Sequence, residues 1–139
     1  MPLLGFTVFK EKILNETKRQ TIRKIRKHPF QIGDVLHIYW KLRTKQCEKL
    51  GVAFCTNHFL VSMQSEEDAV GRQRLRILKW ENIEWIPMGY EETLELAVRD
   101  GFKDDVEMLT WFADRYPLPE TFEVIQWGNL FQKEAQKVE

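Results

Sequence analysis

The spacing of apolar residues changes along this 139-residue chain, and that change constrains the fold it can adopt. β-prone runs occupy roughly the first two-thirds, among them Val35–Trp40, Leu50–Met63 and Arg72–Glu84. Two later segments, Glu91–Arg99 and Val106–Tyr116, carry apolar residues at helical spacing, before alternation returns. Strands, then two helices, then a closing strand predict an α+β fold: a small mixed or antiparallel β-barrel with helices packed outside.

One compact domain is expected from the length and from the absence of repeats, low-complexity tracts and Pro- or Gly-rich linkers. Its core is placed at about residues 6–127, and residues 128–139 are expected to form a polar C-terminal tail. A short helix is expected over Phe6–Asn15 with Thr7 as its N-cap, and an acidic loop over Ser65–Gly71.

The segment TKRQTIR at residues 17–23 places cations around a hydroxyl, on a stretch predicted to be a strand from Lys18 to Arg23. Because side chains alternate between the faces of a strand, Arg19, Thr21 and Arg23 are expected to share one face. Lys18 then lies at the entry to the strand. A threonine between fixed cations suits an anionic or strongly polar ligand such as a nucleotide. The alternative is a charged edge strand that meets only solvent.

The net charge of zero hides a strong asymmetry along the chain. Residues 1–80 carry 16 Lys and Arg against 7 Asp and Glu, whereas residues 81–139 carry 5 against 14. The stretch Lys10–Lys27 alone has 8 basic and 2 acidic side chains. Such a split indicates a surface for polyanions in the first half, unless the two halves neutralise each other in the folded protein.

Cysteine and histidine spacing gives no sign of a metal site. Cys47 and Cys55 are eight residues apart without a C-x-x-C pair, and the three histidines show no ligand spacing with them. Neither a metal, nor a cofactor, nor a structural disulfide is therefore expected. No apolar run approaches the roughly 20 residues that span a bilayer, and the N-terminus lacks the features of a secretory signal. A cytoplasmic protein without a membrane partner is expected.

Several groups of residues occur in a particular order. From the N-terminus they are Phe9 and Ile13-Leu14, Lys18-x-x-Thr21-x-Arg23, Phe30-x-x-Gly33-Asp34-Val35-Leu36, Ile38-Tyr39-Trp40-x-x-Arg43, Leu50-Gly51, Ala97-x-x-Asp100-Gly101-Phe102, and Tyr116-Pro117 before the final strand. This ordered set resembles the activating signal cointegrator homology (ASCH) domain, a member of the PUA-like β-barrel superfamily. The resemblance runs from about Phe6 to Trp127, nearly the whole chain.

The resemblance implies an RNA-related role, because PUA-like barrels are mostly RNA-binding modules or readers that accept a modified base in a cleft. The best-defined activity in the ASCH family is that of a small bacterial amidohydrolase acting on N4-acetylcytidine. A lysine, a threonine and a glutamate are its proposed catalytic set. By the resemblance, the first two correspond to Lys18 and Thr21. The glutamate corresponds to Asp100, which is one methylene shorter.

The function expected first is binding of RNA, or of a nucleotide with a modified base, in RNA processing, modification or translation-related regulation. Lys18 and Arg23 are expected to contact phosphate, and Thr21 to hydrogen-bond a phosphate or a base edge. Trp40 offers a stacking surface for an unpaired base. The full set of expected nucleic-acid contacts is Lys18, Arg19, Thr21, Arg23, Arg26, Lys27, Trp40 and Arg43.

Two other functions remain open. In an amidohydrolase, Thr21 is the nucleophile, Lys18 its base, and Asp100 orients the lysine or handles the leaving amine. A lysine paired with an aspartate tends to stay protonated, which favours binding over chemistry. The second alternative is a protein-interaction module that uses the acidic C-terminal half. The oligomeric state is left open.

Overall fold

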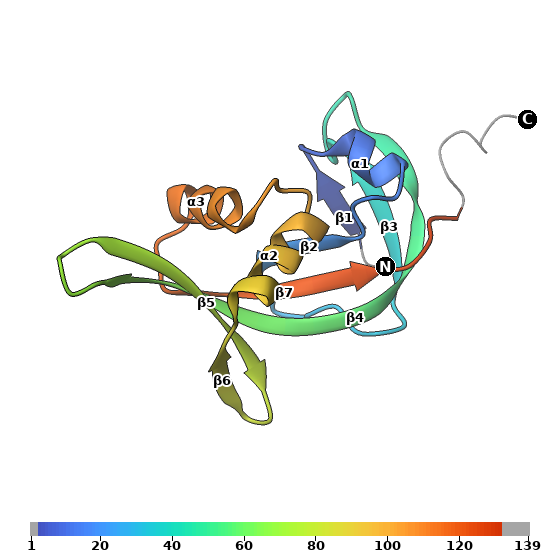
Figure 1. Ribbon diagram of the computed structural model, residues 1–139. Coiled ribbons are helices and arrows are strands. Elements are labelled where there is room, and N and C mark those ends of the chain that lie inside the picture. The colour runs from blue at the N-terminus through green and yellow to red at the C-terminus, as the bar shows by residue number, and fades with distance from the viewer. Residues whose placement is uncertain (1–2, 132–139) are drawn as a thin grey trace, which may run out of the picture. The chain divides into compact units, whose positions relative to one another are not determined.

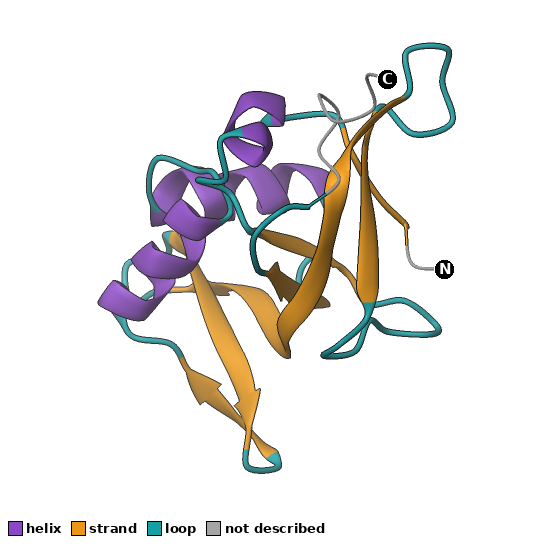
Figure 2. Ribbon diagram, turned by 90° about the vertical axis from the view of Figure 1, so that its right-hand side faces the viewer, coloured by secondary structure: helices purple, strands orange, loops and turns teal. Residues whose placement is uncertain are grey.

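The computed structural model describes residues 3–131, and in Figure 1 these form seven strands and three helices. In chain order the elements are β1 (Leu3–Phe6), α1 (Lys10–Leu14), β2 (Gln20–Lys24), β3 (Val35–Trp40), β4 (Glu48–Glu67), β5 (Gln73–Glu81), β6 (Glu84–Pro87), α2 (Tyr90–Arg99), α3 (Asp105–Arg115) and β7 (Glu120–Trp127). Figure 2 distinguishes the helices from the strands by colour. The predicted α+β class is confirmed.

The seven strands belong to one mixed sheet. Its main path runs β1-β3-β4-β5-β6, with β7 paired to β4 and β2 paired to β7. β1 lies parallel to β3, whereas the β3–β4, β4–β5 and β5–β6 pairs are antiparallel. Among residues 3–131 these pairings do not join into a closed ring. The sheet is therefore mixed, and the predicted β-barrel is not confirmed.

The described residues divide into two compact units. The first holds residues 3–21, 30–58 and 125–131, and the second holds 22–29 and 59–124. The 20-residue strand β4 contributes to both, since its first part pairs with β3 and its last part, Val61–Glu67, pairs with β5. β2 and β7 likewise contribute residues to both units. The expectation of a single domain stays a prediction.

The first unit is built around a core of apolar side chains from β1, β3, β4 and β7. Leu4 and Phe6 alternate with more exposed neighbours along β1, as Leu36 and Ile38 do along β3, so one face of each strand is buried. The remaining members are Ile13, Phe30, Leu50, Ala53, Cys55, Ile125, Trp127 and Leu130. Trp127 of this core is joined to the entrance of β2, because its N–H donates to the Arg19 carbonyl at 3.0 Å.

The second unit packs α2 and α3 with β5. An aromatic group centred on Phe112 includes Phe102, Trp111, Tyr116 and Phe122, with ring centres 4.9–6.4 Å from Phe112. At the end of α2, the N–H of Phe102 donates to the Ala97 carbonyl at 3.0 Å, and Gly101 has a φ of 108°. Gly101 thus ends this helix, because a left-handed residue there satisfies the last carbonyls.

The N-terminal segment differs from its prediction. Leu3–Phe6 forms a strand parallel to β3, with Leu4 opposite Ile38, and α1 begins only at Lys10. Thr7 does not cap that helix, because Phe9 occupies the N-cap position without a side-chain cap bond. The predicted helix is confirmed over Lys10–Leu14, and its predicted start at Phe6 is wrong, because burial of alternate residues against β3 outweighs the local helical spacing there.

The predicted acidic loop over Ser65–Gly71 is also wrong for its first three residues. β4 extends to Glu67, and Glu66 pairs in register with Arg74 of β5. The guanidinium of Arg76 lies 3.2 Å from the Glu66 carboxylate, so cross-strand charge pairs stabilise a strand whose sequence is typical of a loop. The turn itself is closed by the Asp68 N–H, which donates to the Arg72 carbonyl at 2.8 Å.

The expected C-terminal tail begins later than residue 128. Leu130 is buried, and Phe131 exchanges two backbone hydrogen bonds with Val52 of β4. Leu130 packs over Gly51, where a Cβ atom would lie 3.3 Å from its side chain. Apolar burial therefore continues past β7, and the rest of the expected tail, residues 132–139, lies outside the described residues.

Candidate functional site

Lys18 lies in the first unit, just before β2, and its side chain is almost completely buried. Its residue exposure is 2%. The ammonium nitrogen lies 5.6 Å from the centre of the Phe6 ring and 5.3 Å from that of Phe9. Ring faces attract cations, more strongly where water is excluded. The Lys18 ammonium group is therefore held against two aromatic rings, one from β1 and one from the start of α1.

Phe9 reaches this position through an unusual backbone. Its φ of 65° lies in the left-handed region, which a bulky side chain rarely adopts. The Ile13 N–H donates to the Phe9 carbonyl at 3.0 Å, which anchors the residue as the N-cap of α1. The turn between β1 and α1 thus places both rings beside the lysine that follows α1.

Thr21 lies in β2 and is buried at 6% exposure, together with its neighbours Gln20 and Ile22. The side-chain amide of Gln126 donates to Gln20 Oε1 at 2.9 Å. The Trp127 N–H also donates to the Arg19 carbonyl at 3.0 Å, at the entrance to β2. This part of the motif is not a solvated edge strand, because its side chains are packed and hydrogen-bonded.

Arg19 lies one residue before β2, since the strand begins at Gln20 and not at the predicted Lys18. Its side chain is exposed, and its Nε donates to the Glu16 carbonyl at 3.1 Å. A guanidinium nitrogen also lies 3.9 Å from the Glu16 carboxylate. Because Arg19 is outside the strand, strand alternation does not place it on a face with Thr21. It remains accessible to a charged ligand.

Arg23 belongs to the second unit, where buried carboxylates surround it. The pKa of Arg23 is lowered from 12.5 to about 10, chiefly by burial and to a smaller extent by the charge of Arg26. Asp100, Tyr116 and Glu123 act in the opposite direction. Asp100 is 5% exposed and Glu123 is fully buried. Since a pKa of about 10 is far above 7, the guanidinium stays charged at neutral pH and offsets these buried acids.

Arg26 and Lys27 follow β2 in the second unit, and both are exposed. The Arg26 guanidinium donates to the His28 carbonyl at 3.1 and 3.3 Å, while its backbone N–H donates to a Glu123 oxygen at 3.2 Å. This loop therefore has a defined conformation that presents cations to solvent.

Trp40 and Arg43 lie at the end of β3 and in the following loop, in the first unit. Trp40 is half-buried, with the ammonium groups of Lys10 and Lys41 at 5.8 and 5.7 Å from its ring. Arg43 is exposed at a φ of 66°. A base that stacks on Trp40 would thus meet a ring already flanked by two cations.

The predicted site residues are divided between the units. The first unit holds Lys18, Arg19, Thr21, Trp40 and Arg43, and the second holds Arg23, Arg26, Lys27 and Asp100. The structure brings Asp100 into the environment of Arg23. The association of Asp100 with Lys18 and Thr21 stays a prediction.

Sequence reasoning missed three contributors: Phe6, Phe9 and Glu123. The two rings were assigned to the core of a helix, and no sequence signal marks the left-handed conformation of Phe9. Glu123 lies between Phe122 and Val124 in β7, and these three residues are buried. A charged residue between two apolar ones in a predicted strand is the sequence signal that could have identified Glu123 as a buried acid.

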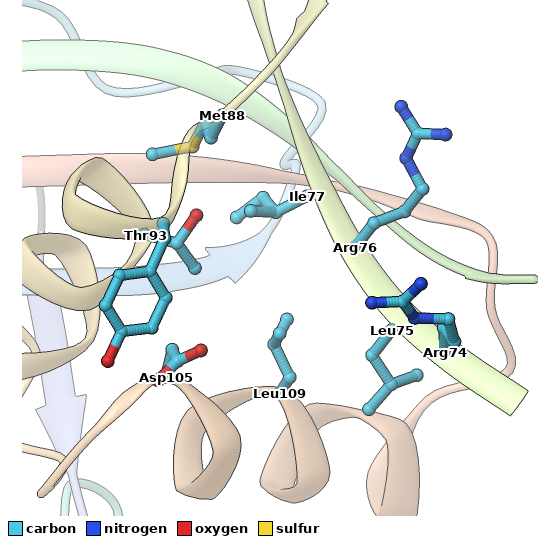
Figure 3. A pocket seen from close by; sticks show the side chains of 9 residues that line it. Arg74, Leu75, Arg76, Ile77, Met88, Thr93, Asp105 and Leu109 are labelled. Carbon is cyan, nitrogen blue, oxygen red and sulfur yellow. The ribbon is translucent and has the colours of Figure 1, made fainter.

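A separate pocket of about 300 Å³ lies within the second unit. Figure 3 shows Arg74 and Arg76 of β5 on one side, Thr93 and Asp105 on the other, and Leu75, Ile77 and Leu109 between them. The Thr93 hydroxyl donates to the Gly89 carbonyl at 2.8 Å, and Arg76 is paired with Glu66. None of the predicted site residues lines this pocket.

Across residues 3–131, no group of three or more His, Cys, Asp or Glu side chains is arranged to hold a metal ion. Both cysteines are free thiols, Cys55 buried and Cys47 exposed. In the same part of the chain, no helix combines the length and apolar character needed to cross a bilayer.

Comparison with known proteins identifies no relative. No family model matches the chain, and no curated protein or solved structure matches it significantly.

Proposed function

We propose that this chain is an ASCH-type protein with a PUA-like fold, and that it binds RNA, or a nucleotide with a modified base, at Lys18 and Thr21. The observation that supports this most is the burial of Lys18 at 2% exposure against the rings of Phe6 and Phe9. Burying an ammonium group costs free energy, so such lysines are more typical of functional sites than of ordinary surfaces.

The chemistry of this group suits a nucleobase better than a phosphate chain. The Lys18 ammonium is a donor only, whereas the Thr21 hydroxyl both donates and accepts. Together they match the mixed hydrogen-bonding edge of a base, and the neighbouring rings match its flat face. In this proposal the phosphates are bound by exposed cations, Arg19, Arg26, Lys27 and Arg43.

A second candidate is hydrolysis of an N4-acylated cytidine at the same residues. The observation that favours it is that Lys18 and Thr21, a potential base and a potential nucleophile, are both buried in one unit. A hydroxyl needs an adjacent base to attack an amide. This candidate requires Asp100 to act on Lys18, whereas nucleotide binding does not.

Calorimetric titration with N4-acetylcytidine and with cytidine tests the binding proposal. Lys18→Met, which keeps the packing volume but removes the charge, is expected to weaken nucleoside binding at least about tenfold. Lys12→Met is the matched control, because its ammonium lies 5.2 Å from the same Phe9 ring but is exposed. Equal affinities for the wild type and Lys18→Met would refute the site.

Chromatography of the same mixtures separates the two candidates. Release of cytidine by the wild type but not by Lys18→Met or Asp100→Asn would establish the hydrolase. Binding without release would favour recognition alone.

Salt-dependent binding of a single-stranded RNA oligonucleotide tests the role of the exposed cations. Binding should weaken steeply as salt rises, and the Arg26→Ala, Lys27→Ala double variant should flatten that dependence by about two phosphate contacts. Arg99→Ala serves as the control, since this exposed arginine is already within 3.9 Å of Glu95. A slope unchanged by the double variant would remove Arg26 and Lys27 from the interface.

A further inference from the structure

The hairpin between β5 and β6 is the most exposed apolar feature of the second unit. Trp80 pairs with Trp85 and Glu81 with Glu84, which leaves Asn82 and Ile83 as a two-residue loop. Figures 1 and 2 show this hairpin projecting away from α2 and α3. The prediction of one strand over Arg72–Glu84 is therefore wrong, because the chain turns back at Asn82 and Ile83. Residues 80–86 are called the hairpin tip below.

The hairpin tip exposes large apolar side chains. Ile83 is 86% exposed, Trp80 40%, Trp85 37% and Ile86 36%. The two tryptophan rings meet edge to face with their centres 5.3 Å apart, which gives them a fixed mutual arrangement. Single exposed apolar residues are ordinary, but Ile83 at the turn is flanked by the Trp80–Trp85 pair on one face of the hairpin, and exposed apolar groups of this kind occur at interaction sites. Ile86 lies on the opposite face, because side chains alternate along a strand.

The backbone of the loop is poorly suited to Ile83. Asn82 has a φ of 51° and Ile83 a φ of 63°, as both central residues of a type I′ turn require. Asparagine tolerates this conformation and glycine is preferred at the second position, whereas a β-branched residue there is strained. The turn alone does not explain an isoleucine. Residues in such conformations cluster at functional sites.

The charges of the hairpin tip indicate what it meets. Glu81 and Glu84 stand directly opposite each other, and like charges in that position repel. Lys79 lies 3.9 Å from Glu81, but within the described residues Glu84 has no ion pair. Two carboxylates beside the tip disfavour nucleic acid and anionic membranes, whereas a basic surface would stabilise them.

We propose that the hairpin tip docks into an apolar pocket, bordered by lysine or arginine, on a partner protein. Ile83 fills the pocket, the Trp80–Trp85 pair packs against its wall, and Glu81 and Glu84 pair with the basic border. A buried aliphatic and aromatic centre with a charged rim is the usual anatomy of such interfaces. The hairpin tip includes neither Lys18 nor Thr21, so the inference goes beyond the proposed function.

Selection from a library of short random peptides tests the proposal, with the wild-type protein as bait and Ile83→Gly for subtraction. The enriched peptides are expected to combine an apolar cluster with flanking lysine or arginine. Measured by fluorescence polarisation, their affinity should fall about tenfold in Ile83→Gly and also in Glu84→Lys. Val106→Ser is the matched control, because Val106 is 66% exposed on α3 but lies outside the hairpin tip.

The glycine variant should stay folded, because Asn-Gly is a better type I′ turn than Asn-Ile, and its melting temperature checks this. Three results would overturn the proposal. The first is peptide affinity that is equal in the wild type and Ile83→Gly. The second is enrichment of acidic or uncharged peptides. The third is that Ile83 is instead required for binding single-stranded RNA or anionic lipid vesicles, or for dimerisation in sedimentation.

Discussion

The ammonium nitrogen of Lys18 lies 5.3 Å from the centre of the Phe9 ring, and Phe9 holds its backbone at a φ of 65°. The same ring is approached by the exposed Lys12, at 5.2 Å. One aromatic side chain therefore contacts two lysines of very different burial. Comparing variants of Lys18 and Lys12 therefore separates the effect of burying a lysine side chain from the effect of cation–ring attraction.

Lys18→Ala is expected to destabilise the fold by about 2 kcal/mol, because it leaves a void beside two rings. Lys18→Met should cost less than about 1 kcal/mol, since its side chain is similar in volume. Urea denaturation measures both. The exposed Lys12→Ala should change the unfolding free energy by less than about 0.5 kcal/mol. If Lys18→Ala were no more destabilising than Lys12→Ala, the lysine stem would not be packed as the structure has it.

His37 is expected to make the stability of the protein fall in mild acid. The Lys49 ammonium donates to His37 Nδ1 at 3.2 Å, and burial together with this charge lowers the pKa of His37 below 6.5. The unfolded chain then takes up the proton more readily, so the unfolding free energy decreases as the pH falls below 6.5. Urea denaturation at pH 7.5 and at pH 5.5 measures this.

The control for this pH dependence is a pair of histidine variants. His37→Gln should reduce the difference in stability between the two pH values, whereas His28→Gln, at an exposed loop position, should leave it unchanged. An NMR titration of the His37 ring reads its pKa directly. A midpoint at or above 6.5 would contradict the expected direction.

Helices and strands whose signal lies in their local residue pattern were predicted well. β3 has the predicted bounds Val35–Trp40, and α2 starts one residue before the predicted Glu91 and ends at Arg99 as expected. The end of α2 was predictable because Gly101 readily adopts the left-handed conformation that terminates a helix. β1 was missed because its pairing with β3 is a long-range contact that local spacing does not report. The β5–β6 turn was missed because Ile83 occupies a position where glycine is the usual signal.

The candidate site divides in the same way. Lys18 and Thr21 were selected from their spacing, which the sequence shows directly. Their burial depends on the two rings beside Lys18 and on the pairing of β2 with β7, which no local pattern contains. The proposed contacts of these residues with a ligand stay predictions, as does the involvement of Asp100.

The N-cap of α3 should contribute measurably to stability. Asp104 Oδ1 accepts a hydrogen bond from the Glu107 N–H at 2.9 Å, and the Glu107 carboxylate accepts one from the Lys103 N–H at 2.8 Å. Asp104→Ala leaves the first of these N–H groups without its acceptor, and should cost about 1 kcal/mol in urea denaturation. Asp105→Ala is the neighbouring control. It removes only a favourable charge from the first turn, worth about 0.5 kcal/mol. Equal losses would mean that charge, rather than the cap bond, stabilises this helix end.

Ile83→Gly is expected to stabilise the protein by about 1 kcal/mol, even though it deletes a large apolar side chain. Ile83 is 86% exposed, so little burial is lost, and its φ of 63° is strained for isoleucine but not for glycine. The gain is smaller than the full strain because glycine loses more backbone entropy on folding. Urea denaturation of the two proteins under the same conditions measures the difference.

Val70→Gly is the matched control, in the loop between β4 and β5. Val70 is likewise exposed, at 71%, but it is not among the described residues with a positive φ. Val70→Gly therefore brings only the entropic cost of glycine and should destabilise the protein slightly. If Ile83→Gly stabilises the protein and Val70→Gly does not, Ile83 lowers the stability of the folded state. An isoleucine that destabilises the fold is consistent with a side chain that serves an interaction. Destabilisation by Ile83→Gly would mean that the loop accommodates isoleucine without strain, and would remove one support for the docking role of the hairpin tip.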